Sequence, residues 1–66
     1  MLRKGDLVRR LRQPGRGPFN GRVGIVVGHP HRHPYGRALV RWMWGDMILT
    51  NEHTGWLEVL VRGSQG

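Results

Sequence analysis

Short apolar runs separated by glycine and proline form the pattern of this 66-residue chain. Eleven glycines and four prolines divide it into segments of about four to seven residues, which is shorter than a stable helix and typical of strands. The segments rich in Val, Ile, Leu or Trp predict five strands, at residues 6–12, 22–27, 38–44, 47–50 and 58–61. We therefore expect an all-β fold with no helix longer than one turn.

Alternation along these segments predicts which side chains form the core. Successive side chains of a strand point to opposite faces, so Val23, Ile25 and Val27 are expected to share one face. The same reasoning on the other segments gives an expected core of Val8, Val23, Ile25, Val27, Val40, Trp42, Leu49, Leu57 and Val59.

The connections between the segments have distinct turn chemistry. Residues 13–21 read QPGRGPFNG, in which proline restricts φ and glycine permits positive φ, and they predict a long ordered loop. Residues 28–36 form a second loop with three histidines and two prolines. Gly45 and Asp46 predict a two-residue hairpin turn, and residues 51–56 a single tight turn.

The charge is unevenly distributed along the chain. Residues 1–41 hold ten of the eleven basic side chains against Asp6 alone, a net charge of +9, whereas residues 42–66 hold Arg62 against three carboxylates, a net charge of −2. Ten of the eleven basic residues are arginine, which favours forked hydrogen bonding to phosphate or carboxylate. An anionic partner at the N-terminal side is expected.

Three segments carry a resemblance to a known fold. Residues 4–9 (KGDLVR), 21–26 (GRVGIV) and 57–60 (LEVL) resemble the SH3-like barrels, and the glycine spacing of the first two is similar to the KOW pattern of ribosomal and transcription-associated proteins. The layout is also similar to small barrel proteins of tailed bacteriophages. The resemblance implies a small five-stranded SH3-like barrel at residues 1–62, followed by a C-terminal tail at 63–66.

The residues that catalysis requires are few. The carboxylates are Asp6, Asp46, Glu52 and Glu58, of which Asp6 fits a turn before the first strand and Asp46 the hairpin turn, and the one serine lies near the C-terminus. No Ser-His-Asp arrangement is credible with this set, so we expect no enzymatic activity. The glycines at 21 and 24 predict a bulge or a close strand crossing and not a nucleotide site, since no Gly-Lys-Ser/Thr follows.

Histidine is the remaining candidate for a metal site. His29, His31 and His33 alternate within one loop, and neutral imidazoles suit zinc, copper or nickel. No carboxylate lies nearby and Arg32 and Arg37 repel a cation, so we expect neither a metal nor another cofactor.

Basic residues interleaved with aromatic residues form the most informative set. The candidate binding residues are Arg9, Arg10, Arg12, Arg16, Phe19, Arg22, Arg32, Tyr35, Arg37 and Trp44. Three roles are open for such a set. The arginines could contact phosphates while an aromatic ring stacks on a base, or they could bind acidic patches on a protein partner. The third role is a basic face exposed to solvent.

Two functions remain open on these residues. The first is a non-enzymatic structural or accessory protein of a phage particle (cement, head-completion or tail accessory), docked through loops 13–21 and 28–36 and its tail on a larger capsid or tail protein with an acidic surface. The alternative is a KOW-like nucleic-acid-binding module. No signal peptide and no membrane-spanning run is recognisable, so we expect the protein in the virion or the host cytoplasm, without a membrane partner.

Overall fold

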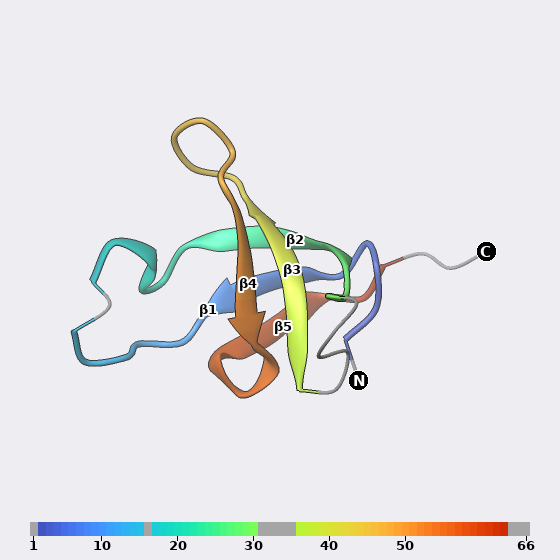
Figure 1. The fold of residues 1–66 in the computed structure, drawn as a ribbon, viewed down its shortest axis with the longest axis horizontal. Helices are drawn as coiled ribbons and strands as arrows, with labels where there is room; N and C mark the ends of the chain where they lie inside the picture. Colours follow the sequence, from blue (N-terminus) through green and yellow to red (C-terminus); the bar gives the residue numbers. More distant parts are fainter. Residues whose placement is uncertain (1, 16, 31–35, 64–66) are drawn as a thin grey trace.

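The computed structural model describes residues 2–15, 17–30 and 36–63 of the chain (Figure 1). Five strands are present: β1 (Leu7–Arg10), β2 (Val23–Gly28), β3 (Arg37–Trp42), β4 (Leu49–His53) and β5 (Leu57–Val61). The described residues contain no α-helix, only the 3₁₀ turns η1 (Gly17–Phe19) and η2 (Thr54–Trp56). The all-β prediction is confirmed, and nowhere in these ranges is a helix long and apolar enough to cross a membrane.

All five strands belong to one antiparallel sheet with the order β4-β3-β2-β1-β5. The sheet is strongly bent, because β3 and β4 run across the direction of β1 and β5 (Figure 1). Its register shifts between Val26 and Gly28 on β2 and between Leu7 and Val8 on β1. Irregularities of this kind increase the local twist of a strand and allow a sheet to fold over itself.

The core lies inside the bend. Val8, Val26, Ala38, Val40 and Trp42 are fully buried, Leu2 and Leu57 are nearly so, and Phe19 and Val59 pack against them half-buried. The predicted burial of Val8, Val40, Trp42 and Leu57 is confirmed.

The predicted inner face of β2 is wrong. Ile25 is 37% exposed and Val23 and Val27 are half-buried, whereas Val26 is fully buried. The inner face carries Gly24 and Val26. Because glycine has no side chain, the more apolar face of this strand in the sequence is the outer one.

Gly24 is where β2 crosses close to β3. It pairs with Trp42, and a Cβ atom built on it would lie 2.7 Å from Val40 Cγ1 and 2.8 Å from the Arg41 carbonyl oxygen. Only a residue without a side chain fits this crossing. The close strand crossing predicted at Gly24 is confirmed.

The β3–β4 connection differs from the predicted two-residue hairpin. The backbone N–H of Met47 donates to the carbonyl of Trp44 at 3.2 Å, and Gly45 has φ +60°, so the tight turn is present. The strands nevertheless stop short of it, at Trp42 and Leu49. Met47 takes up a left-handed conformation with φ +58°, which interrupts the ladder and lengthens the connection to residues 43–48.

The face of β4 is also opposite to the prediction. Leu49 is 49% exposed, while Glu52 is buried and Thr50 half-buried on the inner side. The predicted turn at 51–56 is confined to η2, where Nδ1 of His53 accepts a hydrogen bond from the Gly55 backbone N–H.

Candidate docking surface

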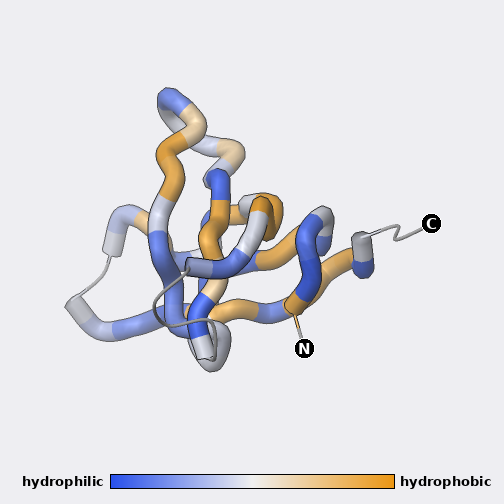
Figure 2. Tube along the Cα trace, turned by 45° about the vertical axis from the view of Figure 1, so that its right-hand side comes forward, coloured by the Kyte–Doolittle hydropathy of each residue, from blue (hydrophilic) through white to orange (hydrophobic). Residues whose placement is uncertain are grey.

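Exposed apolar side chains gather around the β3–β4 connection. Eight large hydrophobic residues are exposed in the described ranges. Five of them lie on or next to this connection: Ile25, Met43, Met47, Ile48 and Leu49. We call these five residues, together with Arg41, the hairpin surface. Figure 2 shows the apolar stretch continuing from β4 into the connection, interrupted by a hydrophilic tip. Single exposed hydrophobics are normal, but a cluster of them marks an interaction site.

Arg41 lies at the centre of the hairpin surface. The register places it beside Ile25 on β2 and beside Leu49 on β4, both on the same face of the sheet. Its side chain is exposed and has no hydrogen bond or ion pair within the described part of the chain. The hairpin surface is therefore apolar with an unneutralised cation in its middle.

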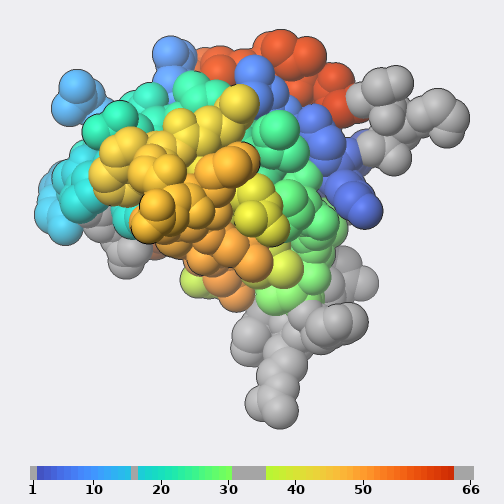
Figure 3. Space-filling model, turned by 90° about the horizontal axis from the view of Figure 1, so that it is seen from above, coloured from blue at the N-terminus to red at the C-terminus, as the bar shows by residue number. Residues whose placement is uncertain are grey.

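A stack of three side chains lies between the loop after β1 and the hairpin. The guanidinium of Arg22 lies over the Trp44 ring at 4.6 Å, and Phe19 contacts Trp44 edge-on with ring centroids 5.4 Å apart. Phe19 also packs on the core indole of Trp42 at 5.6 Å. Figure 3 shows the atoms of this loop beside those of the hairpin.

The loop itself is held by short-range hydrogen bonds. The Asn20 side chain accepts from the Gln13 backbone N–H at 3.0 Å and donates to the Gln13 carbonyl at 3.1 Å. The N–H of Gly21 donates to the carbonyl of Arg10, which closes the loop onto the end of β1. These contacts agree with the long ordered loop predicted from the sequence, and they fix η1 and Phe19 in place.

Of the candidate binding residues, the structure brings Phe19, Arg22 and Trp44 together. Two others are engaged elsewhere: Arg9 forms an exposed ion pair with Glu58 at 2.7 Å, and Nε of Arg37 donates to the Asn51 side chain at 2.9 Å. Arg12 is exposed. Arg16, Arg32 and Tyr35 lie outside the described residues, as do most of loop 28–36 and the tail beyond Gly63.

Arg10 has to be removed from the candidate set because it is buried. Only 2% of its side chain is exposed, its Nη1 lies 3.0 Å from Oε1 of Glu52, and its guanidinium lies 5.1 Å from the centre of the Trp56 ring. In the part of the chain that the structure describes, its Nε and Nη2 atoms have no hydrogen-bond partner. The sequence contains one indication of this burial: Arg10 is two residues after the core residue Val8 on the same strand, so the two side chains point to the same face of the sheet.

A chain of hydrogen bonds extends this buried ion pair into the core. Trp42 Nε1 donates to the Thr50 hydroxyl at 2.7 Å, and that hydroxyl donates to Glu52 Oε2 at 2.7 Å. The polar residues on the inner side of β4 thus provide a hydrogen-bond acceptor for the indole N–H of Trp42. Glu52 therefore has a structural role.

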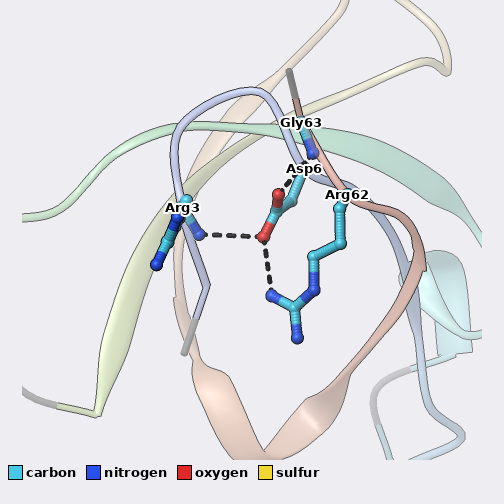
Figure 4. Close-up of a pocket in the computed structure, with 4 residues that line it drawn as sticks. All are labelled: Arg3, Asp6, Arg62 and Gly63. Atoms are coloured by element: carbon cyan, nitrogen blue, oxygen red, sulfur yellow. Dashed lines mark hydrogen bonds and ion pairs between the residues drawn. The ribbon is translucent and has the colours of Figure 1, made fainter. Parts of the chain in front are cut away.

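Asp6 ties the two ends of the fold together (Figure 4). Its buried carboxylate accepts hydrogen bonds from the backbone N–H groups of Gly63 at 2.6 Å and Arg3 at 2.9 Å, and from Nη1 of Arg62 at 3.3 Å. These backbone donors, Gly63 foremost, hold the pKa of Asp6 below its ordinary value. The predicted turn at Asp6 is confirmed by the bond from its N–H to the Arg3 carbonyl.

The surrounding hollow, of about 340 Å³, is lined by Arg3, Asp6, Arg62 and Gly63. The Asp6 carboxylate already accepts hydrogen bonds from three donors, so the hollow is where the segment around Arg3 meets the segment around Arg62 and Gly63. Sequence reasoning found the turn but missed the contact with Gly63, which lies at the other end of the chain.

The histidine loop can be followed only at its first member. Nδ1 of His29 lies 3.0 Å from the carbonyl oxygen of Arg37, while His31 and His33 lie outside the described residues. No group of three metal-binding side chains occurs within the described ranges.

No family model, no curated protein and no solved structure matches this chain. The hairpin surface and the adjoining Arg22–Trp44 stack are the features on which the functional argument rests.

Proposed function

We propose that this chain is a non-enzymatic docking module that binds a larger protein through the hairpin surface. The observation that carries the proposal is that, of the eight large hydrophobic residues exposed in the described ranges, four lie on the β3–β4 hairpin and a fifth, Ile25, on the neighbouring strand β2. Met43 and Met47 are 57% and 50% exposed. Methionine is enriched in interface cores, and fully burying a Met, Leu or Ile side chain contributes about 1.5–3 kcal/mol.

Charge supports an acidic partner. The chain carries a net charge of +7, and Arg41, in the middle of the hairpin surface, has no neutralising neighbour among the described residues. Burying an arginine in an interface is costly unless the other protein supplies a carboxylate. The partner we propose therefore presents carboxylates among apolar side chains.

The resemblance to small phage barrels suggests where such a partner occurs. We infer a structural or accessory protein of a phage particle, docked on a capsid or tail protein and located in the virion or the host cytoplasm. The bent five-stranded sheet is consistent with the SH3-like barrel that the resemblance implies.

Nucleic-acid binding receives less support from the placement of the side chains. Arg10 is buried, and Phe19 packs against two indoles instead of presenting a free face to a base. Residues 42–49 contain no basic side chain and include Asp46. A phosphate backbone lying along the hairpin would meet apolar groups and a carboxylate.

The test compares two matched double variants as immobilised baits in extracts of the native source. Met43→Thr/Leu49→Thr removes apolar surface at the hairpin, and Leu60→Thr/Val61→Thr removes apolar surface on β5, where the two residues are 40% and 59% exposed. Threonine retains strand propensity.

Quantitative mass spectrometry should show one protein retained by the wild type and by the β5 variant. We expect its recovery on the hairpin variant to fall at least about tenfold, since about 1.4 kcal/mol corresponds to a factor of ten. Equal recovery on both variants would contradict the proposal. Loss of recovery after nuclease treatment would point instead to the nucleic-acid module.

A further inference from the structure

We propose that Arg22 is a pre-organised fork that binds a carboxylate of the partner. This inference rests on the proposed docking function and names the chemical group that the loop side of the hairpin recognises. The guanidinium carbon lies over the Trp44 ring, 4.6 Å from its centroid, and its Nε donates to the Pro18 carbonyl at 3.3 Å. Its orientation is thus set from two directions before any ligand arrives.

The two η nitrogens of Arg22 remain open. The residue is exposed, and within the described ranges the only hydrogen bond of its side chain is the one from Nε. A planar guanidinium with both η nitrogens free matches the two oxygens of a carboxylate. A freely rotating arginine side chain loses rotamer entropy when it binds, and a side chain that is already fixed loses less.

The other described arginines near the strands lack this combination. Arg9 is neutralised by Glu58, Arg37 is occupied by Asn51, and Arg10 is buried against Glu52. Among the described residues, no ring, carbonyl or carboxylate contacts the side chain of Arg41, so nothing there orients it. Arg22 is both oriented and open.

The support beneath the stack is rigid. Phe19 braces Trp44 from the side at 85° between ring planes and is itself packed on Trp42 in the core. Trp44 therefore connects Arg22 to the core through two aromatic contacts. Trp and Arg are the residues most enriched at interface hot spots.

The neighbourhood favours a carboxylate of a protein over a phosphate backbone. In the sequence, Trp44 is flanked by Met43, Met47 and Ile48, which are exposed, and residues 42–49 contain no basic side chain. A polyphosphate requires several cations along its path. A single acidic side chain flanked by apolar residues, by contrast, requires one guanidinium and apolar side chains around it.

The experiment titrates the ¹⁵N-labelled protein with acetate at constant ionic strength, with chloride as the counter-titrant. The signals followed are the Nε–H groups of Arg22 and Arg41 and the indole N–H of Trp44. We expect a saturable shift at Arg22 and Trp44 and only a small, linear one at Arg41. Equal responses of the two arginines would overturn the proposal.

Three variants separate the fork from its charge. Arg22→Lys keeps the charge but removes the fork, and should abolish the saturable shift of Trp44; Arg41→Lys is the matched control and should leave it unchanged. Trp44→Leu keeps Arg22 but removes its platform, and should weaken acetate binding about two- to fivefold, the value of an exposed cation–π contact. The Trp42 indole signal reports that each variant is folded.

Two further results would overturn the inference: unchanged acetate binding in Trp44→Leu, or preferential binding of inorganic phosphate in a parallel titration. The docking function is judged separately, because the acetate titration needs no partner. A saturable acetate site with no loss of capture in the hairpin variant would uphold the fork and reject the docking surface.

Discussion

The buried pair of Arg10 and Glu52 makes the folding of this domain depend on one ion pair. We consider Glu52→Gln, which removes the negative charge but keeps the shape and the ability to accept from the Thr50 hydroxyl. Arg10 would then remain 2% exposed with no carboxylate beside it. Among the described residues its Nε and Nη2 have no hydrogen-bond partner, and the Trp56 ring 5.1 Å away supplies no counter-charge.

The magnitude follows from burial. Removing one partner of a buried pair costs about 3–5 kcal/mol, because an uncompensated charge is left inside. A 66-residue domain has a total stability of roughly 3–10 kcal/mol, at about 0.05–0.15 kcal/mol per residue. Glu52→Gln is therefore expected to remove a large part of the free energy of unfolding.

A double-mutant cycle measures the pair itself. Arg10→Met/Glu52→Gln removes both charges and should be more stable than Glu52→Gln alone, with a coupling energy of about 1–3 kcal/mol. The control cycle uses the exposed pair of Arg9 and Glu58, whose side chains are 48% and 46% exposed and whose coupling should stay below about 1 kcal/mol.

Urea denaturation followed by tryptophan fluorescence supplies the free energies. Should Glu52→Gln not fold, both cycles are measured in a stabilising osmolyte, which raises the stability of all variants. Equal coupling in the two cycles would refute the reasoning, because Arg10 would then be as solvated as Arg9.

Two other predictions follow from the fold. Gly24→Ala should destabilise the protein by about 1–3 kcal/mol, since the new Cβ meets Val40 and the Arg41 backbone. The control Gly17→Ala, which has open space around the new Cβ, should change the urea midpoint little. Similar urea midpoints for the two variants would contradict the close crossing of β2 and β3. Because the pKa of Asp6 is lowered in the folded state, the stability due to its carboxylate is present above the ordinary value of 3.8 and is lost as the pH falls below it. Asp6→Asn should be less stable at neutral pH and show a flatter acid limb than the wild type, and parallel acid limbs would count against the role of Asp6.

The spacing of glycine, proline and apolar residues was enough to predict five strands and an all-β fold. The boundaries and faces were less accessible, because they depend on contacts between strands. The inner face of β2 is set by Gly24 against Trp42, and a glycine adds nothing to an apolar pattern. The hairpin length is set by the left-handed Met47, a residue type that gives no sign of positive φ.

The candidate site was predictable in its residue types but not in its assembly. Phe19, Arg22 and Trp44 were recognised as candidates, yet their stacking requires β2 and β3 to be paired in the observed register. Arg10 was misplaced because a charged residue was assumed to be exposed, and its partner Glu52 is distant in the sequence. The apolar hairpin surface was missed because Ile25 and Leu49 were assigned to the core.

Oxidative footprinting of the assembled protein tests the docking claim most directly. Met43 and Met47 are exposed in the isolated chain and methionine oxidises readily, so both should be oxidised rapidly when the protein is free. Bound to its partner, the chain should be protected at Met43, Met47 and Trp44, with Leu11 and Leu60 unchanged. Undiminished oxidation of both methionines in the complex would contradict docking through the hairpin surface.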